Sequence, residues 1–356
     1  MDPSATAKER LRAGQTLEAL GTSDSLAQAI GCYDEALAAL RQLPFESDPQ
    51  LRRDLGVAWM NRGNALQKQA SPASLAEAVA AYDEAIAHLQ KLPLLENSAY
   101  ANSLGAAWLN RGHAFQQQDG ASLREAVLSH QTAIAILQKL PVAEDRSALI
   151  NLAAAWMNLA NALLALNAPK HADARVAAQA SLALCARAES SDPVMADIAL
   201  KARRALCDAI GHLLVAAGSD QAAVGTLATE ASDAIDHGLA LVRHWEFHGI
   251  QTHRALANRL YRFGAQLYLI HQPHFLAEFL LESLDPPAAP GALADDPRPQ
   301  AFAAEFVLHA LTTLRATSLV GLSLAEQARL HGAVIELEAA ALKIAGLSES
   351  HLKSAL

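Results

Sequence analysis

Apolar and polar residues follow the same order three times in the first half of this chain. A tryptophan is followed by asparagine two positions later and by glycine or alanine four positions later, starting at Trp59, Trp108 and Trp156. The tryptophans lie 49 residues (108 − 59) and 48 residues (156 − 108) apart. A recurrence at one spacing of this size predicts a repeat architecture, in which similar units stack on one another.

A second pattern completes each of these units. The residues around Tyr33, Tyr82 and, more loosely, His130 match one another, and each unit then closes on a Leu-Pro pair. No stretch alternates between apolar and polar residues for long enough to indicate a strand. The units are therefore predicted to consist of helices.

Capping boxes predict where some of these helices begin. In such a box a serine oxygen accepts a hydrogen bond from an early backbone N–H, while a Gln or Glu three residues later reaches back to the cap. Three boxes at equivalent places, and a fourth near the C-terminus, are formed by Ser25 and Gln28, Ser74 and Glu77, Ser122 and Glu125, and Ser323 and Glu326.

The order of marker residues resembles the tetratricopeptide (TPR) repeat, a helix-turn-helix unit. In the clearest copy the matching residues are Trp59, Gly63, Leu66, Ala78, Tyr82, Ala85 and Pro93. The resemblance implies that Gly63 and Ala78 let two helices approach closely, and that Trp59, Leu66 and Tyr82 fill the space around that contact. It covers roughly residues 8–190, where each unit is about 15 residues longer than the family's 34.

The predicted fold is all-α, a TPR-like helical-hairpin solenoid that forms a right-handed superhelix and has a divergent C-terminal helical region. The first helix is expected to begin at Lys8, and five prolines mark the one long stretch without helix. The expected organisation is a flexible tail at 1–7, four TPR-like hairpins at 8–190, divergent helical repeats at 191–284, a Pro-rich linker at 285–300 and a C-terminal helical pair at 301–356.

Composition and charge narrow the function classes. The net charge is −9, and Lys and Arg never form a run longer than two, so neither a nucleic-acid partner nor an anionic membrane is expected. Three widely spaced cysteines indicate neither a disulfide framework nor a zinc motif.

No secretory signal or transmembrane run is visible, so a cytoplasmic location is expected. Phosphate-binding, dinucleotide-binding and nucleophile motifs are lacking, so we expect neither an enzyme nor a cofactor.

The asparagines of the tryptophan copies are candidate binding residues. In peptide-binding TPR proteins the equivalent positions of the first helix face the concave groove, where an amide can hold a peptide backbone or carboxylate. The candidates are Asn61, Asn64, Asn110, His113, Asn158 and Asn161. The alternative is that these residues have no ligand. The family's carboxylate-clamp cations are missing, since Met60 and Ala154 occupy their positions.

Two arginines stand where the family usually has leucine. Arg62 and Arg111 are candidate polar contacts for a ligand in the groove. Alternatively, each packs its stem on the protein and pairs its head with an acidic residue of its own hairpin, Asp83 or Glu84 in the case of Arg62.

Histidines gather between residues 237 and 274 and suggest an alternative metal site. On one helix His237, His244 and His248 fall on a single stripe, and His253 is a candidate third ligand from the next helix. Trp245 stands where a metalloprotease of the HExxH type has its glutamate. The alternative is a set of ordinary helix histidines without metal.

The sequence thus predicts an interaction scaffold or adaptor that binds a peptide or protein segment in the concave groove. The negative charge favours a neutral or basic partner. Two alternatives remain open. One is a metal- or small-molecule-dependent protein that uses the His-rich 237–274 region, and the other is a self-assembling subunit that forms homo-oligomers through its C-terminal helices.

Overall fold

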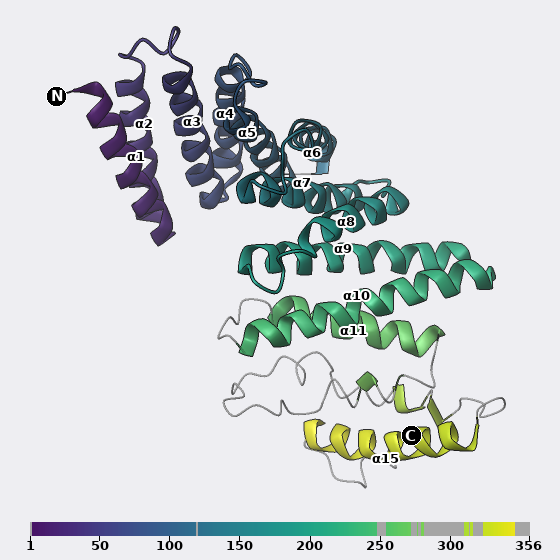
Figure 1. Cartoon of the computed structure of the whole chain (residues 1–356). Helices are drawn as coiled ribbons and strands as arrows, with labels where there is room; N and C mark the ends of the chain where they lie inside the picture. The colour runs from purple at the N-terminus through teal and green to yellow at the C-terminus, as the bar shows by residue number, and fades with distance from the viewer. Residues whose placement is uncertain are drawn as a thin grey trace. The chain divides into compact units, whose positions relative to one another are not determined.

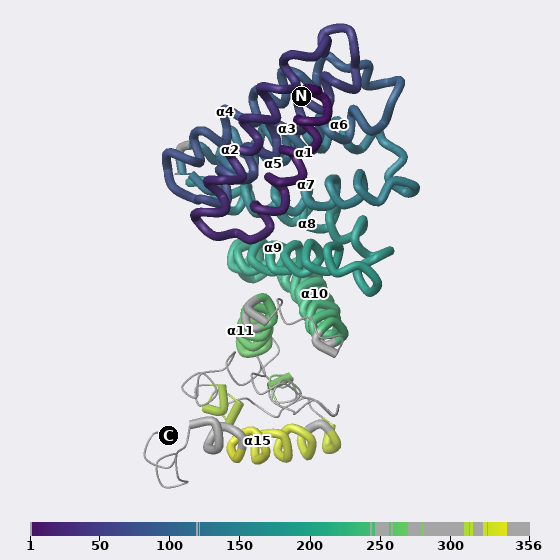
Figure 2. The backbone as a smooth tube through the Cα atoms, turned by 90° about the vertical axis from the view of Figure 1, so that its left-hand side faces the viewer, coloured from purple at the N-terminus to yellow at the C-terminus, as the bar shows by residue number. Residues whose placement is uncertain are grey.

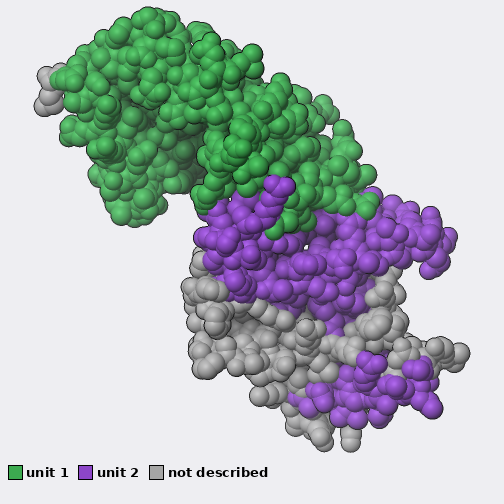
Figure 3. Space-filling view, in the orientation of Figure 1, with its two compact units in different colours: residues 1–186 green, residues 187–356 purple. Residues whose placement is uncertain are grey.

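The computed structural model describes residues 2–118, 120–247, 254–271, 276, 279–280, 310–312, 314–315 and 323–345. Within these residues the protein is all-helical and contains no strand (Figures 1 and 2). The chain divides into two compact units, residues 1–186 and 187–356 (Figure 3). The all-α prediction is confirmed.

The first unit is a series of four helical hairpins. Each first helix packs against the second helix that follows it, and each second helix packs against the next first helix. The first helices are α1 (Pro3–Leu20), α3 (Pro49–Gln69), α5 (Ser98–Gln117) and α7 (Arg146–Ala165). The second helices are α2 (Ser23–Leu40), α4 (Pro72–Leu89), α6 (Leu123–Leu137, after the 3-10 turn η1, Gly120–Ser122) and α8 (His171–Cys185).

The described helices of the second unit are 18 to 27 residues long. Its described elements are α9 (Pro193–Ala217), α10 (Gln221–Phe247), α11 (Arg254–His271) and α15 (Leu324–Ala345). Helices α9, α10 and α11 pack against one another. The predicted linker at 285–300 lies outside the described residues, as does most of the first helix of the predicted C-terminal pair.

The N-terminus differs from the expectation of a flexible tail. Helix α1 begins at Pro3, not at Lys8, because Asp2 caps it and accepts a hydrogen bond from the backbone N–H of Ser4 at 3.0 Å. Proline at the first helical position is compatible with this start, since that position needs no N–H donor.

Two capping boxes lie three residues earlier than predicted. Thr22 and Ser71 are the N-caps, and their hydroxyl oxygens accept from the backbone N–H groups of Ser25 and Ser74 at 3.2 and 3.1 Å. The Ser25 and Ser74 hydroxyls bond back to the cap N–H groups, each at 3.0 Å. Serine at the third position therefore fills the role that the prediction gave to Gln or Glu.

The other two predicted helix starts have a different outcome. Ser122 stands at the N-cap of α6, but its side chain makes no capping hydrogen bond because a 3-10 turn leads into the helix. Helix α15 begins at Leu324, directly after Ser323, as predicted.

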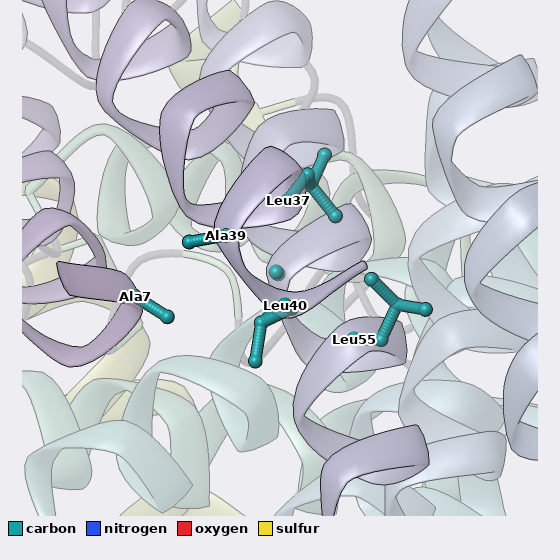
Figure 4. Packing of buried hydrophobic residues seen from close by; sticks show 6 residues of the cluster. Ala7, Leu37, Ala39, Leu40 and Leu55 are labelled. Carbon is teal, nitrogen blue, oxygen red and sulfur yellow. The ribbon is translucent and has the colours of Figure 1, made fainter. Parts of the chain in front are cut away.

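A core of small and branched side chains joins neighbouring hairpins. Ala7 of α1, Leu37 and Leu40 of α2, and Leu55 of α3 belong to one buried cluster (Figure 4). Alanine at such positions lets helices approach closely, and the leucines fill the remaining space. The cluster shows why this Ala- and Leu-rich sequence forms stacked hairpins rather than separate helices.

In each of the first three hairpins, a buried ring of the second helix packs against a glycine of the first helix. We call this pair the ring–glycine contact. A Cβ atom added to Gly14, Gly63 or Gly112 would lie 2.5 to 2.6 Å from a carbon of the facing ring. Real Cβ atoms essentially never come that close, so glycine is required. The pairs are Gly14 with Tyr33, Gly63 with Tyr82, and Gly112 with His130.

One polar atom of each ring has a partner on the first helix of the same hairpin, while Nδ1 of His130 is buried without a hydrogen bond. The Tyr33 hydroxyl donates to Glu18 Oε2 at 2.8 Å, and the Tyr82 hydroxyl donates to Gln67 Oε1 at 2.8 Å. His130 Nε2 lies 3.1 Å from Oε1 of Gln116. The three partners each follow the glycine by four residues, so the arrangement repeats with the period of the sequence.

The tryptophans differ from the prediction that they fill the space beside the glycine. Tyr82 is fully buried there, whereas Trp59 is only half-buried. Trp59 packs against two clusters, one shared by α1, α2 and α3 and one shared by α4 and α5. It therefore contributes to the contact between hairpins rather than to the close contact within one.

Helix α7 is long and apolar enough to cross a membrane by length and composition alone. Half of its most apolar stretch is buried. In the first unit α7 packs against α5, α6 and α8, and it supplies buried residues such as Leu152 and Leu159. The core of the hairpin series accounts for this apolar character.

Candidate functional site

The predicted binding residues lie on the first helices of the hairpins. Helices α1, α3, α5 and α7 contact one another in succession, in addition to their contacts with second helices. The surface that these four helices share is called the first-helix face below. Positions spaced three or four residues apart along each helix form its stripe on this face.

Hydrogen bonds connect α3 to α5 across the face. Oδ1 of Asn64 accepts from Nδ2 of Asn110 at 3.1 Å and lies 2.8 Å from the Tyr82 hydroxyl oxygen, whose single proton it shares with Gln67 Oε1. One turn further along, Gln67 Nε2 bonds to Nδ1 of His113 at 3.0 Å. These residues therefore form one network that extends from the buried Tyr82 to the exposed His113.

Further hydrogen bonds connect α5 to α7. Nδ2 of Asn102 donates to Ser147 Oγ at 3.0 Å, and Asn151 Nδ2 donates to Oδ1 of Asn102 at 2.9 Å. Nε2 of Gln116 donates to the backbone oxygen of Asn158 at 2.9 Å. Side-chain amides thus connect three successive first helices.

The sequence prediction did not include Asn102 and Asn151. The two asparagines lie 49 residues apart (151 − 102), one more than the 48 residues between Trp108 and Trp156, so they do not occupy equivalent repeat positions and the repeat gave no signal for them.

The structure brings some predicted residues together and leaves others apart. Asn64, Asn110 and His113 belong to the network between α3 and α5. Asn61 is half-buried, and its Nδ2 atom is buried without a hydrogen-bond partner. Nδ2 of Asn161 lies 3.1 Å from Met157 Sδ, and Asn158 is half-buried with its backbone oxygen bonded to Gln116.

Arg62 and Arg111 make their ionic contacts with second helices. Nε of Arg62 donates to Asp34 Oδ1 of α2 at 2.7 Å, and its NH2 atom lies 3.8 Å from Oε2 of Glu77 on α4. Arg62 pairs with an acidic residue, as the alternative interpretation of the sequence predicted. The predicted partners Asp83 and Glu84 are wrong, because the stacking places Arg62 beside the second helix of the preceding hairpin.

Arg111 repeats this arrangement one hairpin later. Its Nε atom donates to Asp83 Oδ1 of α4 at 2.7 Å, and NH1 contacts Ser129 and Glu125 of α6 at 2.7 and 3.6 Å. The guanidinium also lies 4.7 Å from the ring centroid of Phe115. Both arginines therefore connect successive second helices, and their heads are engaged within the protein.

We expect Arg111→Ala to lower the free energy of unfolding by about 1–2 kcal/mol. The change removes a largely buried guanidinium with two aromatic contacts and a charged hydrogen bond. Denaturant unfolding followed by circular dichroism measures the loss. Arg124→Ala, which removes an exposed arginine of α6, is the control and should change stability little. An equal loss in both variants would show that the Arg111 contacts add nothing specific.

Two of the candidate histidines in the second unit lie within hydrogen-bonding distance of backbone carbonyl oxygens. Nδ1 of His237 lies 2.7 Å from the carbonyl oxygen of Asp233, and Nε2 of His244 lies 2.8 Å from that of Ser190. Among the described residues, no group of three or more His, Cys, Asp or Glu side chains could hold a metal ion. The other two candidate ligands, His248 and His253, lie outside the described residues.

Comparisons with known proteins give a distant likeness. No protein-family model matches the chain, and a search of curated proteins finds no significant match. The crystal structure of BtubC (BKLC) from P. vanneervenii aligns at 17% identity and a TM-score of 0.47, covering 69% of this chain and 84% of that chain. The nuclear import adaptor Nro1 of S. pombe aligns at 12% identity and a TM-score of 0.45, covering 93% and 99%. At these levels the likeness assigns neither a family nor a function.

Proposed function

We propose that the protein is a TPR-like scaffold whose first-helix face binds a segment of a partner protein. The observation that carries this proposal is the hydrogen-bonded network that connects Asn64 to Asn110 and Asn102 to Asn151. These contacts hold polar side chains in place before a partner arrives, and prior ordering lowers the conformational cost of binding.

The chemistry of the face indicates the kind of segment. The α5 and α7 stripes consist of small residues, amides and one histidine, and carry no carboxylate, lysine or arginine. Their members are Ala99, Ser103, Ala106, Asn110, His113 and Gln117, followed by Ser147, Asn151, Ala154, Asn158, Asn161 and Ala165. Amides offer both donors and acceptors to a peptide backbone. The net charge of −9 favours a neutral or basic segment.

Blocking the face without removing its hydrogen bonds tests the proposal. Ala106 and Ala154 are half-buried stripe residues, and Ala106 lies between Asn102 and Asn110, whose side chains reach the neighbouring first helices. Ala106→Arg and Ala154→Arg should each obstruct a docked segment. We expect proteins captured from a native extract by the wild type to be reduced at least about tenfold with these variants, as measured by quantitative mass spectrometry.

The matched control is Gln131→Arg, which adds the same charge at an exposed position of α6. It should leave capture unchanged, and circular dichroism should show the same helicity for all three variants. If folded Ala106→Arg and Ala154→Arg capture the same proteins as the control in the same amounts, binding does not use the first-helix face.

A further inference from the structure

Basic side chains gather at a second place in the first unit, where the loop between α2 and α3 meets the C-terminal end of α4. Arg41 ends α2, Arg52 lies in the second turn of α3, and His88 and Lys91 lie at the end of α4. We call these four residues the basic cluster. In a chain with a net charge of −9, such a group is a local exception.

Arg52 is at the centre of the basic cluster and is incompletely bonded. Its side chain is only 9% exposed. NH2 donates to the backbone oxygen of Glu46 at 3.0 Å and to the Glu46 carboxylate at 2.5 Å. NH1 is buried without a hydrogen-bond partner. A buried guanidinium nitrogen in this condition is unfavourable, because its lost hydration is not replaced.

His88 contributes a second buried nitrogen without a partner. Its Nδ1 atom makes no hydrogen bond, and its ring meets Phe45 edge to face with centroids 5.8 Å apart. The Arg52 guanidinium lies 5.9 Å from the centroid of the same Phe45 ring. The two incompletely bonded groups are therefore held around one aromatic side chain.

The charges of the cluster act on one another. The hydrogen bond from Arg52 lowers the pKa of Glu46, and the positive charges of Arg52, Lys91 and His88 add to this effect. The pKa of His88 is lowered chiefly by burial. Glu84 opposes that shift, while Lys91, Arg52 and Arg41 reinforce it. Two permanent cations, Arg52 and Lys91, thus act on Glu46, and Arg41 acts on the neighbouring His88.

The hairpin fold does not require this chemistry. One repeat period later, Ala101 stands in the place of Arg52 and Ile136 in the place of His88. Ile136 packs against the buried cluster of α4 and α5, and Ala101 is buried in α5. Polar groups that a neighbouring repeat replaces with apolar ones point to a role other than packing.

We propose that the basic cluster binds a phosphate group, carried by a small molecule or by a phosphorylated side chain, which displaces Glu46 from Arg52. The Glu46 side chain is 74% exposed and can swing into solvent. A guanidinium fork fits two phosphate oxygens, and Lys91 and Arg41 supply further positive charge. Phosphate is favoured over another carboxylate because a doubly charged anion is needed to compete with the tethered Glu46.

Titration of the full chain with inorganic phosphate at constant ionic strength tests the proposal, with calorimetry as the readout. We expect saturable binding at one site. Glu46→Gln removes the competing charge and should tighten binding about tenfold. Lys91→Gln should weaken it about two- to fivefold, the range for one exposed ion pair. Neither change touches the core of a hairpin.

Lys139→Gln is the matched control, because Lys139 is exposed at the end of α6 at the position equivalent to Lys91, next to Ile136 instead of His88. It should leave phosphate affinity unchanged. A weakening equal to that of Lys91→Gln would overturn the proposal, since binding would then reflect general charge. Absence of saturable binding to Glu46→Gln would overturn it as well.

A second titration distinguishes the two sources of the phosphate group. It uses a five-residue glycine peptide with a central phosphoserine and the same peptide with serine. Tighter binding of the phosphopeptide than of inorganic phosphate assigns the group to a protein side chain. Equal binding, sensitive to the same variants, assigns it to a small molecule.

Discussion

Tyr82→Ala is expected to lower the free energy of unfolding by about 3–5 kcal/mol, the cost of emptying a packed aromatic position. The ring is fully buried, and its hydroxyl bonds to both Asn64 and Gln67 at 2.8 Å. Removing it leaves a cavity beside Gly63 and takes a donor from the buried Gln67. Urea unfolding followed by circular dichroism measures the loss.

The ring–glycine contact makes a sharper form of this prediction possible. Gly63→Ala should cost about 1–3 kcal/mol in the wild type, because the new methyl group would lie 2.6 Å from Cε1 of Tyr82. The three nearest atoms all belong to the Tyr82 ring. In a Tyr82→Ala background the same substitution should therefore cost little or even stabilise.

The fourth hairpin naturally has alanine at both of these positions. In the fourth hairpin Ala160 replaces the glycine, and the position of α8 that corresponds to the ring is the buried Ala178. Additive effects of Gly63→Ala and Tyr82→Ala would contradict the ring–glycine contact as the reason for glycine. In that case glycine would be required for a reason within α3 itself and not because of the Tyr82 ring.

Stability should fall in mild acid because of His130. Burial lowers the pKa of His130 to about 3, and the nearby His113 adds to this shift. In the unfolded chain the pKa returns to about 6.5. Between these two values the unfolded chain binds a proton that the folded chain does not, so stability is lost as the pH falls below about 6.5. The loss attributable to His130 between pH 7 and pH 4.5 is about 2–3 kcal/mol.

His130→Tyr isolates this contribution from that of other titrating groups. Tyrosine is the residue that the first two hairpins use at this position, and Gln116 is placed to accept from its hydroxyl as Gln67 does from Tyr82. The variant should be less sensitive to acid than the wild type by about 2–3 kcal/mol over the same interval. Urea unfolding of both proteins at pH 7 and pH 4.5 provides the comparison. Equal losses in the two proteins would show that His130 is not held neutral in the folded state.

The repeat and its helices could be predicted because they depend on local order. The Trp59 and Trp108 copies, the matching segments at Tyr33 and Tyr82 and the lack of alternating segments led to an all-α hairpin series. Helix ends were less accurate. Thr22 and Ser71, three residues before the predicted caps, are also suitable cap residues, and the choice depends on where the turn between two packed helices must end.

Part of the candidate site was also predictable. Asn64, Asn110 and His113 were chosen from their register in the repeat, and the structure joins them in one network. That they bind a partner stays a prediction. Arg62 and Arg111 were placed with the same candidates, and the structure instead engages both with acidic residues of second helices.

The sequence by itself determined the period, the helical class and the uncharged character of the α5 and α7 stripes, because each of these depends on residue type and spacing within one unit. Only the tertiary structure decided which residues of different units meet. Arg62 reaches Asp34, 28 residues away, and Asn110 reaches Asn64, 46 residues away. Such pairs depend on the angle and offset at which hairpins stack. These are set by side-chain packing across the whole interface, and no local pattern encodes them.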